Sequence, residues 1–400
     1  MNALKVELGT IEVGTLEMFA DCAHRFTFSE GYISRLLPDR PVLGQLFEDR
    51  FPHSVDVDGP ICWFSHLLPQ GVMRTWRSRL LGIDGDDDFA LLTELGEDMP
   101  GAVRLSPTRS LLATEDQQFV VTPTPSDDTS VLKFSLAGAQ WKLSTRSSGR
   151  GLTTRAKGDG RAYIAKFDAP EYPNLPECEF ATMTWAKETG VSVPEIDLRS
   201  VDDFDVIPEG MPIGNGTVYT IERFDRVNSS RIHIEDFGQI LDRPPGSGQY
   251  HGSYEEIAEV LSWLDPASTV EFLKQIVFAV VCGNGDAHLK NFSVIYSDGR
   301  NAELSLAYDV VSTICYYAPN RESLSLTLGG IRKFSDVTLD SFQSLFRALR
   351  IDSLTGESLV RDTVKRAVDK WSCPGIRDGY SNRHQERIDQ HLDSLEIVKL

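Results

Sequence analysis

The stretch Gly283-Asn284-Gly285-Asp286-Ala287-His288-Leu289-Lys290-Asn291 places a carboxylate, Asp286, five positions before an amide, Asn291. Apolar residues at helical spacing precede this stretch, and its first glycine suits the end of a helix. The residues of the apolar pattern are Phe272, Ile276, Ala279, Val280 and Cys282. The sequence therefore predicts a helix that ends at Gly283 and is followed by a polar loop.

Two short apolar runs follow this loop, at residues 292–296 and 304–308. They flank an Asp298-Gly299 turn, and together they predict a β-hairpin. The hairpin would return the chain to the loop, so we expect Asp309 to lie beside Asn291.

An Asp, an Asn five positions later and a more distant Asp form the polar arrangement of a protein-kinase catalytic loop with its metal aspartate. Phosphoryl transfer needs one carboxylate to orient the attacking hydroxyl and accept its proton, and Asp286 is the candidate. Magnesium prefers hard oxygen ligands, which Asn291 and Asp309 would supply. Lys290 and His288 would contact phosphate or the loop around the nucleophile. The pattern predicts ATP-dependent phosphoryl transfer.

The alternative interpretation is that Asn284-Gly285-Asp286 forms only a polar turn after a helix, because an Asp and an Asn at this spacing often occur together by chance. The helical pattern before the loop and the hairpin pattern after it favour the catalytic interpretation.

Composition sets bounds on the size and class of the protein. The chain has 400 residues, 41% of them hydrophobic, and a formal net charge of −19. This content can bury one large or two medium cores. The acidic charge argues against nucleic-acid binding through a global basic field, but it leaves contact with DNA through a partner open.

The cysteines are widely scattered and include no CxxC pair, so neither metal-site spacing nor a disulfide scaffold is expected. They are Cys22, Cys62, Cys178, Cys282, Cys315 and Cys373. The first residues lack the apolar core of a signal peptide, and no apolar run approaches the roughly 18 residues of a membrane span. We therefore expect a cytoplasmic protein without a membrane partner.

The sequence pattern changes along the chain. Residues 1–105 predict a small α+β module with a hairpin over residues 6–16, a strand at 26–28 and helices at 72–81 and 87–95. Residues 113–129 predict a linker or an extended loop.

The remaining chain becomes strand-rich and then helical. We expect strands at residues 131–135, 162–167 and 217–224, and a helix at about 177–189. Beyond about Asp236 the pattern is mostly helical apart from the hairpin, with a loop at 242–250.

These patterns predict an α+β, protein-kinase-like bilobal fold. We divide it into an N-terminal subdomain (residues 1–105), a region like a kinase N-lobe with phosphate loop and hinge (106–235) and a helix-rich catalytic lobe (236–400). The chemistry would lie at the junction of the lobes, where pockets often form.

The segment Ser135-Leu136-Ala137-Gly138-Ala139-Gln140-Trp141-Lys142 joins a strand to the next segment. Gly138, between two alanines, would let backbone N–H groups approach phosphate oxygens, and Lys142 adds charge. The segment is neither a Walker A loop nor a kinase GxGxxG loop, and a turn between strands is an equal alternative.

Lys166 lies in the middle of a predicted strand among apolar neighbours, like the strand lysine of kinases that binds phosphates. Its expected partner is Glu179 in the following helix, with Glu177 as a competitor. The alternative is an exposed strand lysine and a solvated helix acid.

Residues 220–226 end a strand at the expected lobe junction. The backbone groups of Glu222 and Phe224 would bond the adenine edge there. The charged side chains of Arg223, Asp225 and Arg226 could instead form ion pairs across this hinge.

Together these segments resemble the HipA family of bacterial serine/threonine kinase toxins. The resemblance covers nearly the whole chain in order, and six motifs in order are quite specific. The six motifs are residues 135–142 and 164–166, Glu179 with 186–190, and residues 221–226, 286–291 and 308–309. Residues 65–71, 87–96 and 101–103 resemble the N-terminal region of the family.

The resemblance implies an Mg-ATP-dependent protein kinase. The expected nucleotide-binding residues are Ala137, Gly138, Ala139, Gln140, Lys142, Lys166, Glu222, Arg223, Phe224, His288, Lys290 and Tyr308. It also implies autophosphorylation of Ser135, which would add about two negative charges where the ATP phosphates must bind and so inactivate the kinase. Nearby hydroxyls are further candidates: Ser144, Thr145, Ser147, Ser148, Thr153 and Thr154.

The resemblance further implies two protein partners. One is a HipB-like helix-turn-helix antitoxin, through which contact with DNA would be indirect. The other is a protein substrate; family targets include aminoacyl-tRNA synthetases, whose phosphorylation stops tRNA charging and leads to growth arrest and drug tolerance.

Two features depart from the family pattern. Trp141 replaces a more usual polar residue, and residues 146–161 are basic and Gly-rich. That stretch could dock a target, although we expect a solvated loop. Two alternative functions stay open: a kinase for a small molecule or lipid, and a non-catalytic corepressor that acts with its antitoxin.

Overall fold

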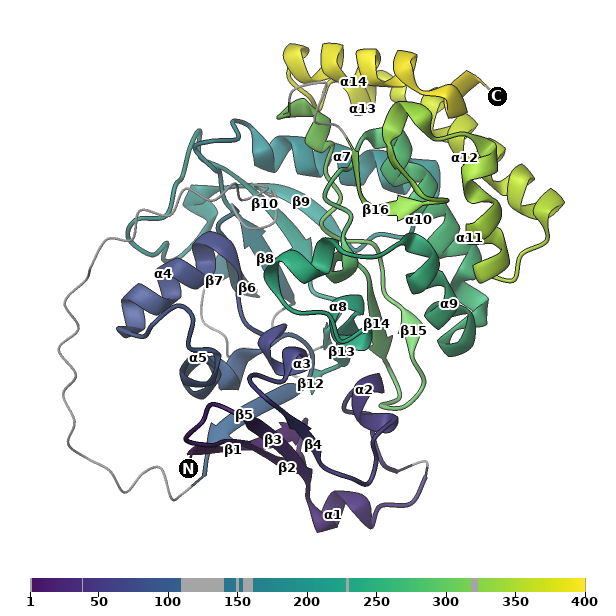
Figure 1. Ribbon diagram of the computed structural model, residues 1–400. Helices are drawn as coiled ribbons and strands as arrows, with labels where there is room; N and C mark the ends of the chain where they lie inside the picture. The colour runs from purple at the N-terminus through teal and green to yellow at the C-terminus, as the bar shows by residue number, and fades with distance from the viewer. Residues whose placement is uncertain are drawn as a thin grey trace. The chain divides into compact units, whose positions relative to one another are not determined.

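The computed structural model describes residues 2–37, 39–108, 140–148, 151–153, 161–227, 230–317 and 323–399. The chain forms two compact units, Met1–Ala139 and Gln140–Leu400 (Figure 1). The predicted linker, the strand at 131–135 and the candidate residues Ser135, Ala137, Gly138 and Ala139 lie outside the described residues. All other candidate site residues belong to the second unit, and the division at residue 235 stays a prediction.

The first unit is built on an antiparallel sheet with the strand order β4-β3-β2-β1-β5. Alternating residues of β1 (Leu4, Val6 and Leu8) are buried, as expected for a sheet with one face on a core. The strands are β1 (Asn2–Leu8), β2 (Ile11–Met18), β3 (His24–Phe28), β4 (Val55–Val57) and β5 (Val103–Pro107). The predicted hairpin and the strand at 26–28 are confirmed.

Short helices complete this unit, and both predicted helices are confirmed. The Asp87 carboxylate caps α5 by accepting the backbone N–H of Ala90 at 2.9 Å. The helices are α1 (Glu30–Ile33), α2 (Gln45–Glu48), α3 (Cys62–Ser65), α4 (Gly71–Leu81), α5 (Asp88–Leu95) and the 3₁₀ helix η1 (Gly96–Asp98).

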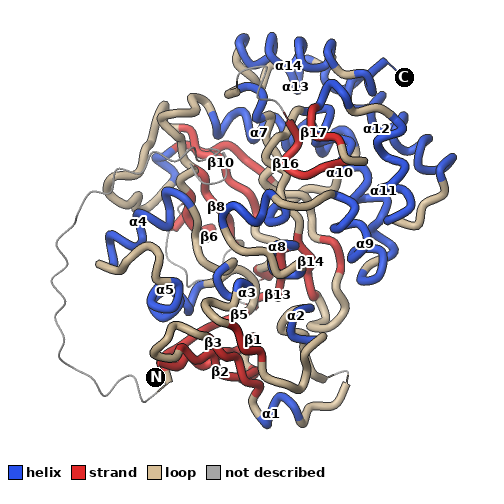
Figure 2. The backbone as a smooth tube through the Cα atoms, in the orientation of Figure 1, coloured by secondary structure: helices blue, strands red, loops and turns tan. Residues whose placement is uncertain are grey.

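The second unit begins with an antiparallel sheet in the order β7-β6-β8-β10-β9. Helix α7 packs on one face of this sheet, where Met183 contacts Tyr219 and Ile221 (Figure 2). The elements are β6 (Lys142–Ser148), β7 (Gly151–Thr153), β8 (Ala162–Lys166), α7 (Leu175–Thr189), β9 (Ile196–Ser200), η3 (Val201–Asp203) and β10 (Thr217–Glu222).

The predicted strands at 162–167 and 217–224 and the helix at 177–189 are confirmed within two residues. The expectation of a solvated loop at residues 146–161 is wrong in part. Arg146 lies in β6, where it pairs with Thr153 of β7 and with Ala162 of β8. The alternation of small polar residues and arginines in this stretch hid a strand pair.

The rest of the second unit is mainly helical. The side chain of Trp185, from α7, is enclosed by Phe278 and Trp371, and its Nε1 donates to Ala367 O at 2.8 Å. The helices are α8 (Phe237–Ile240), η4 (Gly246–Tyr250), α9 (Tyr254–Leu264), η5 (Pro266–Ser268), α10 (Thr269–Cys282), η6 (Leu289–Asn291), η7 (Thr313–Cys315), η9 (Phe334–Asp336), η10 (Leu339–Phe342), α11 (Gln343–Ala348), α12 (Ser353–Trp371), α13 (Pro374–Arg377), α14 (Asn382–Ser394) and η11 (Glu396–Lys399).

Several strands in this region were not predicted. Two of them, β16 (Ser323–Leu328) and β17 (Ile331–Lys333), form a second hairpin, which corrects the expectation of helices alone. The predicted loop at 242–250 also contains η4. Two further short strand pairs are β11 (Arg226–Val227) with β12 (Ser230–Arg231), and β13 (His233–Asp236) with β14 (Ser293–Tyr296).

The predicted helix end and hairpin flank the polar loop as expected. Gly283 caps α10 with a φ of 69°, and a Cβ there would lie 2.7 Å from the Ile314 side chain, so only glycine fits. The hairpin consists of β14 (Ser293–Tyr296) and β15 (Glu303–Leu304), with Val294 opposite Leu304. Its second strand is shorter than predicted, because residues 305–308 leave the sheet on the way to Asp309.

None of the helices in the described part of the chain is long and apolar enough to cross a membrane.

Candidate active site

Lys166 stands at the centre of a buried charge cluster. Its side chain is 3% exposed, and its Nζ contacts carboxylate oxygens of both Glu179 and Asp309. These three residues come from β8, from α7 and from the segment after the hairpin. Gln140 Nε2 adds a hydrogen bond of 3.0 Å to the second oxygen of Glu179. Four candidate residues from separate parts of the sequence therefore share one site.

The competitor for this pairing lies elsewhere. Glu177 accepts a hydrogen bond of 2.7 Å from Asn215 Nδ2 at an exposed position. Glu179 lies on the buried face of α7, and Glu177 does not.

The cluster holds its charges by mutual compensation. Burial alone would lower the pKa of Lys166, but Asp309 and Glu179 outweigh it and raise that pKa. Burial alone would raise the pKa of Asp309, but Lys166 and Lys142 outweigh it and hold the pKa below its usual range. Burial raises the pKa of Glu179, and Lys166 offsets part of that effect. Such perturbed groups often mark functional sites.

The loop that carries Asp286 is fixed by hydrogen bonds on both sides. The Asp286 backbone N–H donates to Asn284 Oδ1 at 3.1 Å, and Asn291 Nδ2 donates to the Asp286 carbonyl at 2.8 Å. The Gly285 N–H donates to Thr313 Oγ1 at 2.7 Å, and its carbonyl accepts from Ser325 Oγ at 2.6 Å. These contacts fix where the Asp286 carboxylate can point.

The Asp286 carboxylate itself accepts a hydrogen bond of 3.3 Å from the Tyr250 hydroxyl. The ring of Tyr250 also packs edge-on against His288, with centroids 4.8 Å apart. His288 is buried, and burial lowers its pKa to about 3, so this imidazole is neutral at ordinary pH.

Lys290 is held by an ion pair within the helical part of the unit. Its Nζ donates to Asp236 Oδ2 at 2.7 Å, and Asp236 also caps α8. Its expected contact with phosphate would therefore compete with Asp236.

The hairpin returns the chain to this loop, as expected. The Tyr308 hydroxyl donates to the Lys290 carbonyl at 2.8 Å. The next residue, Asp309, has a φ of 54°, in the left-handed region that few residues other than glycine adopt. Because the preceding residue, Tyr308, contacts Lys290, Asp309 lies close to the loop of Asp286 and Asn291. Strain of this kind is concentrated at functional sites.

Two oxygens in this region suit a hard cation. Asn291 uses its Nδ2 to hold the loop, and within the described residues its Oδ1 accepts no hydrogen bond. Asp309 Oδ1 accepts a hydrogen bond from Lys166, and among the described residues its Oδ2 has no partner. One amide oxygen and one carboxylate oxygen fit Mg²⁺, which keeps several waters and needs few protein ligands.

At the end of β10 the charged side chains pair with one another. Arg223 donates to both oxygens of Asp225 at 2.8 and 2.7 Å and to Ser144 Oγ at 3.0 Å, and Arg226 Nη1 donates to Asp225 at 2.6 Å. The alternative of ion pairs at this hinge is the one that the side chains adopt.

At the hinge, one of the two candidate residues already uses its backbone N–H in a hydrogen bond, and the other, among the described residues, does not. The Glu222 N–H donates to Glu195 O at 2.8 Å. Phe224 packs against Tyr308, with ring centroids 5.7 Å apart. The described residues offer its N–H no hydrogen-bond acceptor.

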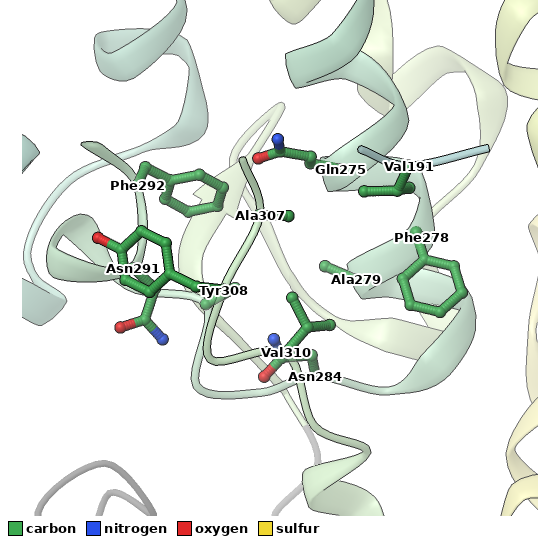
Figure 3. A pocket seen from close by; sticks show the side chains of 11 residues that line it. Val191, Gln275, Phe278, Ala279, Asn284, Asn291, Phe292, Ala307, Tyr308 and Val310 are labelled. Atoms are coloured by element: carbon green, nitrogen blue, oxygen red, sulfur yellow. The ribbon is translucent and has the colours of Figure 1, made fainter. Parts of the chain in front are cut away.

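A small cavity lies behind the loop. Its volume of about 20 Å³ is enough for a water but far below the several hundred Å³ of a nucleotide pocket. Figure 3 shows the largely apolar lining, which also includes the amide residues Gln275, Asn284 and Asn291. Gln275 Nε2 is buried there without a hydrogen-bond partner among the described residues. Residues of the loop line this cavity, which is too small to be the nucleotide site.

Three supporting residues escaped the sequence analysis. Tyr250 contacts Asp286, Thr313 holds Gly285, and the buried Tyr219 ring lies 5.6 Å from Lys166 Nζ. For Tyr219 the strand register could have served as a signal, because Tyr219 and Lys142 lie opposite Lys166 on either side. Nothing in the sequence near Tyr250 or Thr313 indicates their contacts.

Two family models match the chain, and between them they cover most of it. The HipA N-terminal domain matches residues 4–106, and the HipA-like C-terminal domain matches residues 134–371. The chain belongs to the HipA family. The second match contains every candidate site residue from Ser135 to Asp309.

Relatives agree with this membership. An inferred kinase of Sinorhizobium fredii, Y4dM, is 33% identical over 100% of this chain and 98% of its own length. The serine/threonine-protein kinase toxin HipA of Shewanella oneidensis is 27% identical over 63% of this chain and 62% of that protein.

A solved structure agrees in fold. HipA from the Shewanella oneidensis complex of HipA, HipB and operator DNA has a TM-score of 0.71 at 21% identity, and the match covers 98% of this chain and 95% of that one. The α+β, kinase-like HipA fold expected from the sequence is confirmed.

Proposed function

We propose that this HipA-family chain is an Mg-ATP-dependent serine/threonine protein kinase. The observation that carries the proposal is the pairing of Lys166 with both Glu179 and Asp309. A strand lysine, a helix glutamate and a metal aspartate must be in place together in an active protein kinase. A merely structural ion pair would not need the third partner at a strained backbone position.

Each residue has a role that follows from its position. Glu179 holds Lys166 in the site, where its ammonium can turn from Asp309 to phosphate oxygens. Asp286 would orient the substrate hydroxyl and take its proton, while Tyr250 and the fixed loop hold that carboxylate in place. The oxygens of Asn291 and Asp309 would hold Mg²⁺. Bound Mg-ATP would supply the phosphoryl group, whose charge the metal neutralises.

The adenine would lie against the hinge, between the Glu222 carbonyl and the Phe224 N–H. The phosphate loop from Ser135 to Lys142 would cover the phosphates, with Gln140 already hydrogen-bonded to Glu179. Autophosphorylation of Ser135 would place charge in that loop and inactivate the kinase.

We further propose a toxin role. Membership of the HipA family and the Shewanella complex with HipB and operator DNA support a HipB-like antitoxin as partner, with contact to DNA through that antitoxin. The substrate would be a cellular protein, for which aminoacyl-tRNA synthetases are the first candidates. Its phosphorylation would arrest growth.

Labelled ATP tests the reaction class. Wild type should transfer label to a macromolecule in a protein extract and to nothing in a metabolite extract. Asp286→Asn should lose transfer, whereas Asp362→Asn, the same chemical change at an exposed position of α12, should keep it. Label that enters only the metabolite extract would favour a small-molecule kinase. Absence of both ATP binding and transfer in folded protein would favour the corepressor alternative.

A further inference from the structure

A second cluster of reactive side chains lies away from the Lys166 site. Cys178 of α7, Cys315 of η7 and His384 of α14 each offer one ligand atom, and these atoms all lie within 4.8 Å of one another. All three residues are buried, with exposed fractions of 1%, 6% and 5%. They come from three elements of the same unit, in which α14 packs against η7. Figure 1 labels α7 and α14 in the part of this unit that also holds the C-terminus.

The chemistry of this trio suits a soft divalent cation. Two thiolates and an imidazole are a recurrent ligand set for Zn²⁺, with water or another group in the fourth position of a tetrahedron. Two thiolate charges would neutralise the two charges of the ion, which is what a buried site requires. The Tyr316 ring packs against His384 with centroids 5.0 Å apart.

Binding of such a cation would displace the protons of both thiols, because the thiolate is the form of cysteine that ligates a metal ion.

We propose that Cys178, Cys315 and His384 form a binding site for one Zn²⁺ ion. Binding joins α7, η7 and α14 through a single centre. Cys178 directly precedes Glu179, the partner of Lys166, and Cys315 lies six residues after Asp309. The ion therefore fixes the helix and the segment that carry two of the three charges of the proposed ATP site.

The imidazole distinguishes this site from a redox pair. A Cys178–Cys315 disulfide would form from the two thiols with loss of two electrons to an oxidant, and it would not use His384. A nucleophilic role would need access for a substrate, which the burial of all three residues denies.

Metal titration of the full chain tests the proposal. The protein is reduced, stripped with a chelator and titrated with Co²⁺ alone without oxygen. We expect one equivalent to bind with the strong visible bands of a tetrahedral site and thiolate charge-transfer absorption. Co²⁺ binding should release protons in a pH-dependent amount, and Zn²⁺ should then displace Co²⁺. Cys178→Ser, Cys315→Ser and His384→Ala should each weaken binding roughly 100-fold or more.

Controls separate the site from other thiols and from misfolding. Cys22→Ser and Cys373→Ser, at exposed cysteines, should leave the titration unchanged. Circular dichroism identifies ligand variants that fail to fold. For those, NMR spectra of Co²⁺-loaded wild type labelled with ¹⁵N-histidine report directly on imidazole coordination. The proposal is overturned if reduced wild type binds no Co²⁺, if Cys315→Ser binds it as wild type does, or if the thiols only form a disulfide on oxidation.

Discussion

At the scale of single residues, the site depends on one lysine between two carboxylates. The sequence predicts Lys166 and Glu179 because a strand lysine and a helix acid stand in a known order. It does not predict that Asp309 contacts the same ammonium, since 143 positions separate the two residues. Nor does it indicate Tyr219 or Tyr250, whose roles arise from strand register and from a loop.

Replacing Lys166 by methionine should leave Glu179 buried without a counter-charge. We expect a loss of about 3 kcal/mol in the free energy of unfolding, the lower end for a broken buried pair, because Glu179 can take up a proton. The double variant Lys166→Met/Glu179→Gln should regain at least half of that loss. Urea unfolding at neutral pH measures both.

Catalysis should respond differently from stability. We expect kcat/KM for Mg-ATP to fall on the order of 100-fold in Lys166→Met and to stay low in the double variant, because both variants lack the ammonium that would bind phosphate. Activity regained together with stability would contradict the phosphate-binding role of Lys166.

Two buried histidines should make stability depend on acid. Burial lowers the pKa of His288 to about 3 and that of His391 to about 4, below the unfolded value near 6.5. The unfolded chain therefore binds the protons first. The stabilisation is complete above pH 6.5 and is lost as pH falls toward 4, by about 1.4 kcal/mol per pH unit for each histidine.

Urea midpoints between pH 6.5 and 4.5 check this dependence. His288→Gln and His391→Gln should each flatten the slope relative to wild type, whereas His53→Gln, at an exposed position, should not. Equal slopes in wild type and in both buried variants would show that other groups cause the acid sensitivity.

At the scale of elements, the sequence predicts best where the local pattern is long. The periodic helices α4, α5, α7 and α10 and the hairpin after the loop are confirmed because their apolar spacing and turn residues agree. The second hairpin, β16 with β17, was missed although Ser and Thr alternate there with leucine as in a strand, because the surrounding region has a helical pattern. The cluster of Cys178, Cys315 and His384 was missed because it has no local spacing at all.

Gly283 joins α10 to the catalytic loop, and its replacement should be costly. Gly283→Ala places a Cβ in the left-handed region, at roughly 1–2 kcal/mol, and against Ile314 as well. Gly330, in the turn between β16 and β17, has a φ of +81°, and an added Cβ there would meet open space. Gly330→Ala should therefore cost only the strain of the left-handed backbone. We expect the first variant to be at least about 1 kcal/mol less stable than the second. Equal losses in chemical denaturation would mean that Ile314 yields freely.

At the scale of the whole molecule, every described site residue lies in one unit. The core of the first unit, which includes Phe26 and Trp63, contributes no residue to the charge cluster. The family and fold were predictable because motifs occur in order along nearly the whole chain. The phosphate loop up to Ala139 lies outside the described residues and stays a prediction.

The two units should unfold as separate transitions in calorimetry. Mg-ATP at 100 times its Kd should stabilise the second unit by about 2.7 kcal/mol and leave the first unchanged. Phe26→Leu should lower only the transition of the first unit, by roughly 1–2 kcal/mol. A single transition moved by both changes would show that the units unfold together.

The most direct test of the kinase proposal is the intact mass of purified protein after incubation with Mg-ATP. The starting protein must first be shown to be free of phosphate. Wild type should gain one phosphate, mapped to Ser135, while Asp286→Asn, with an unchanged melting temperature, should gain none. No gain by wild type, or an equal gain by both proteins, would contradict the assignment of Asp286 as the catalytic carboxylate of a self-inactivating kinase.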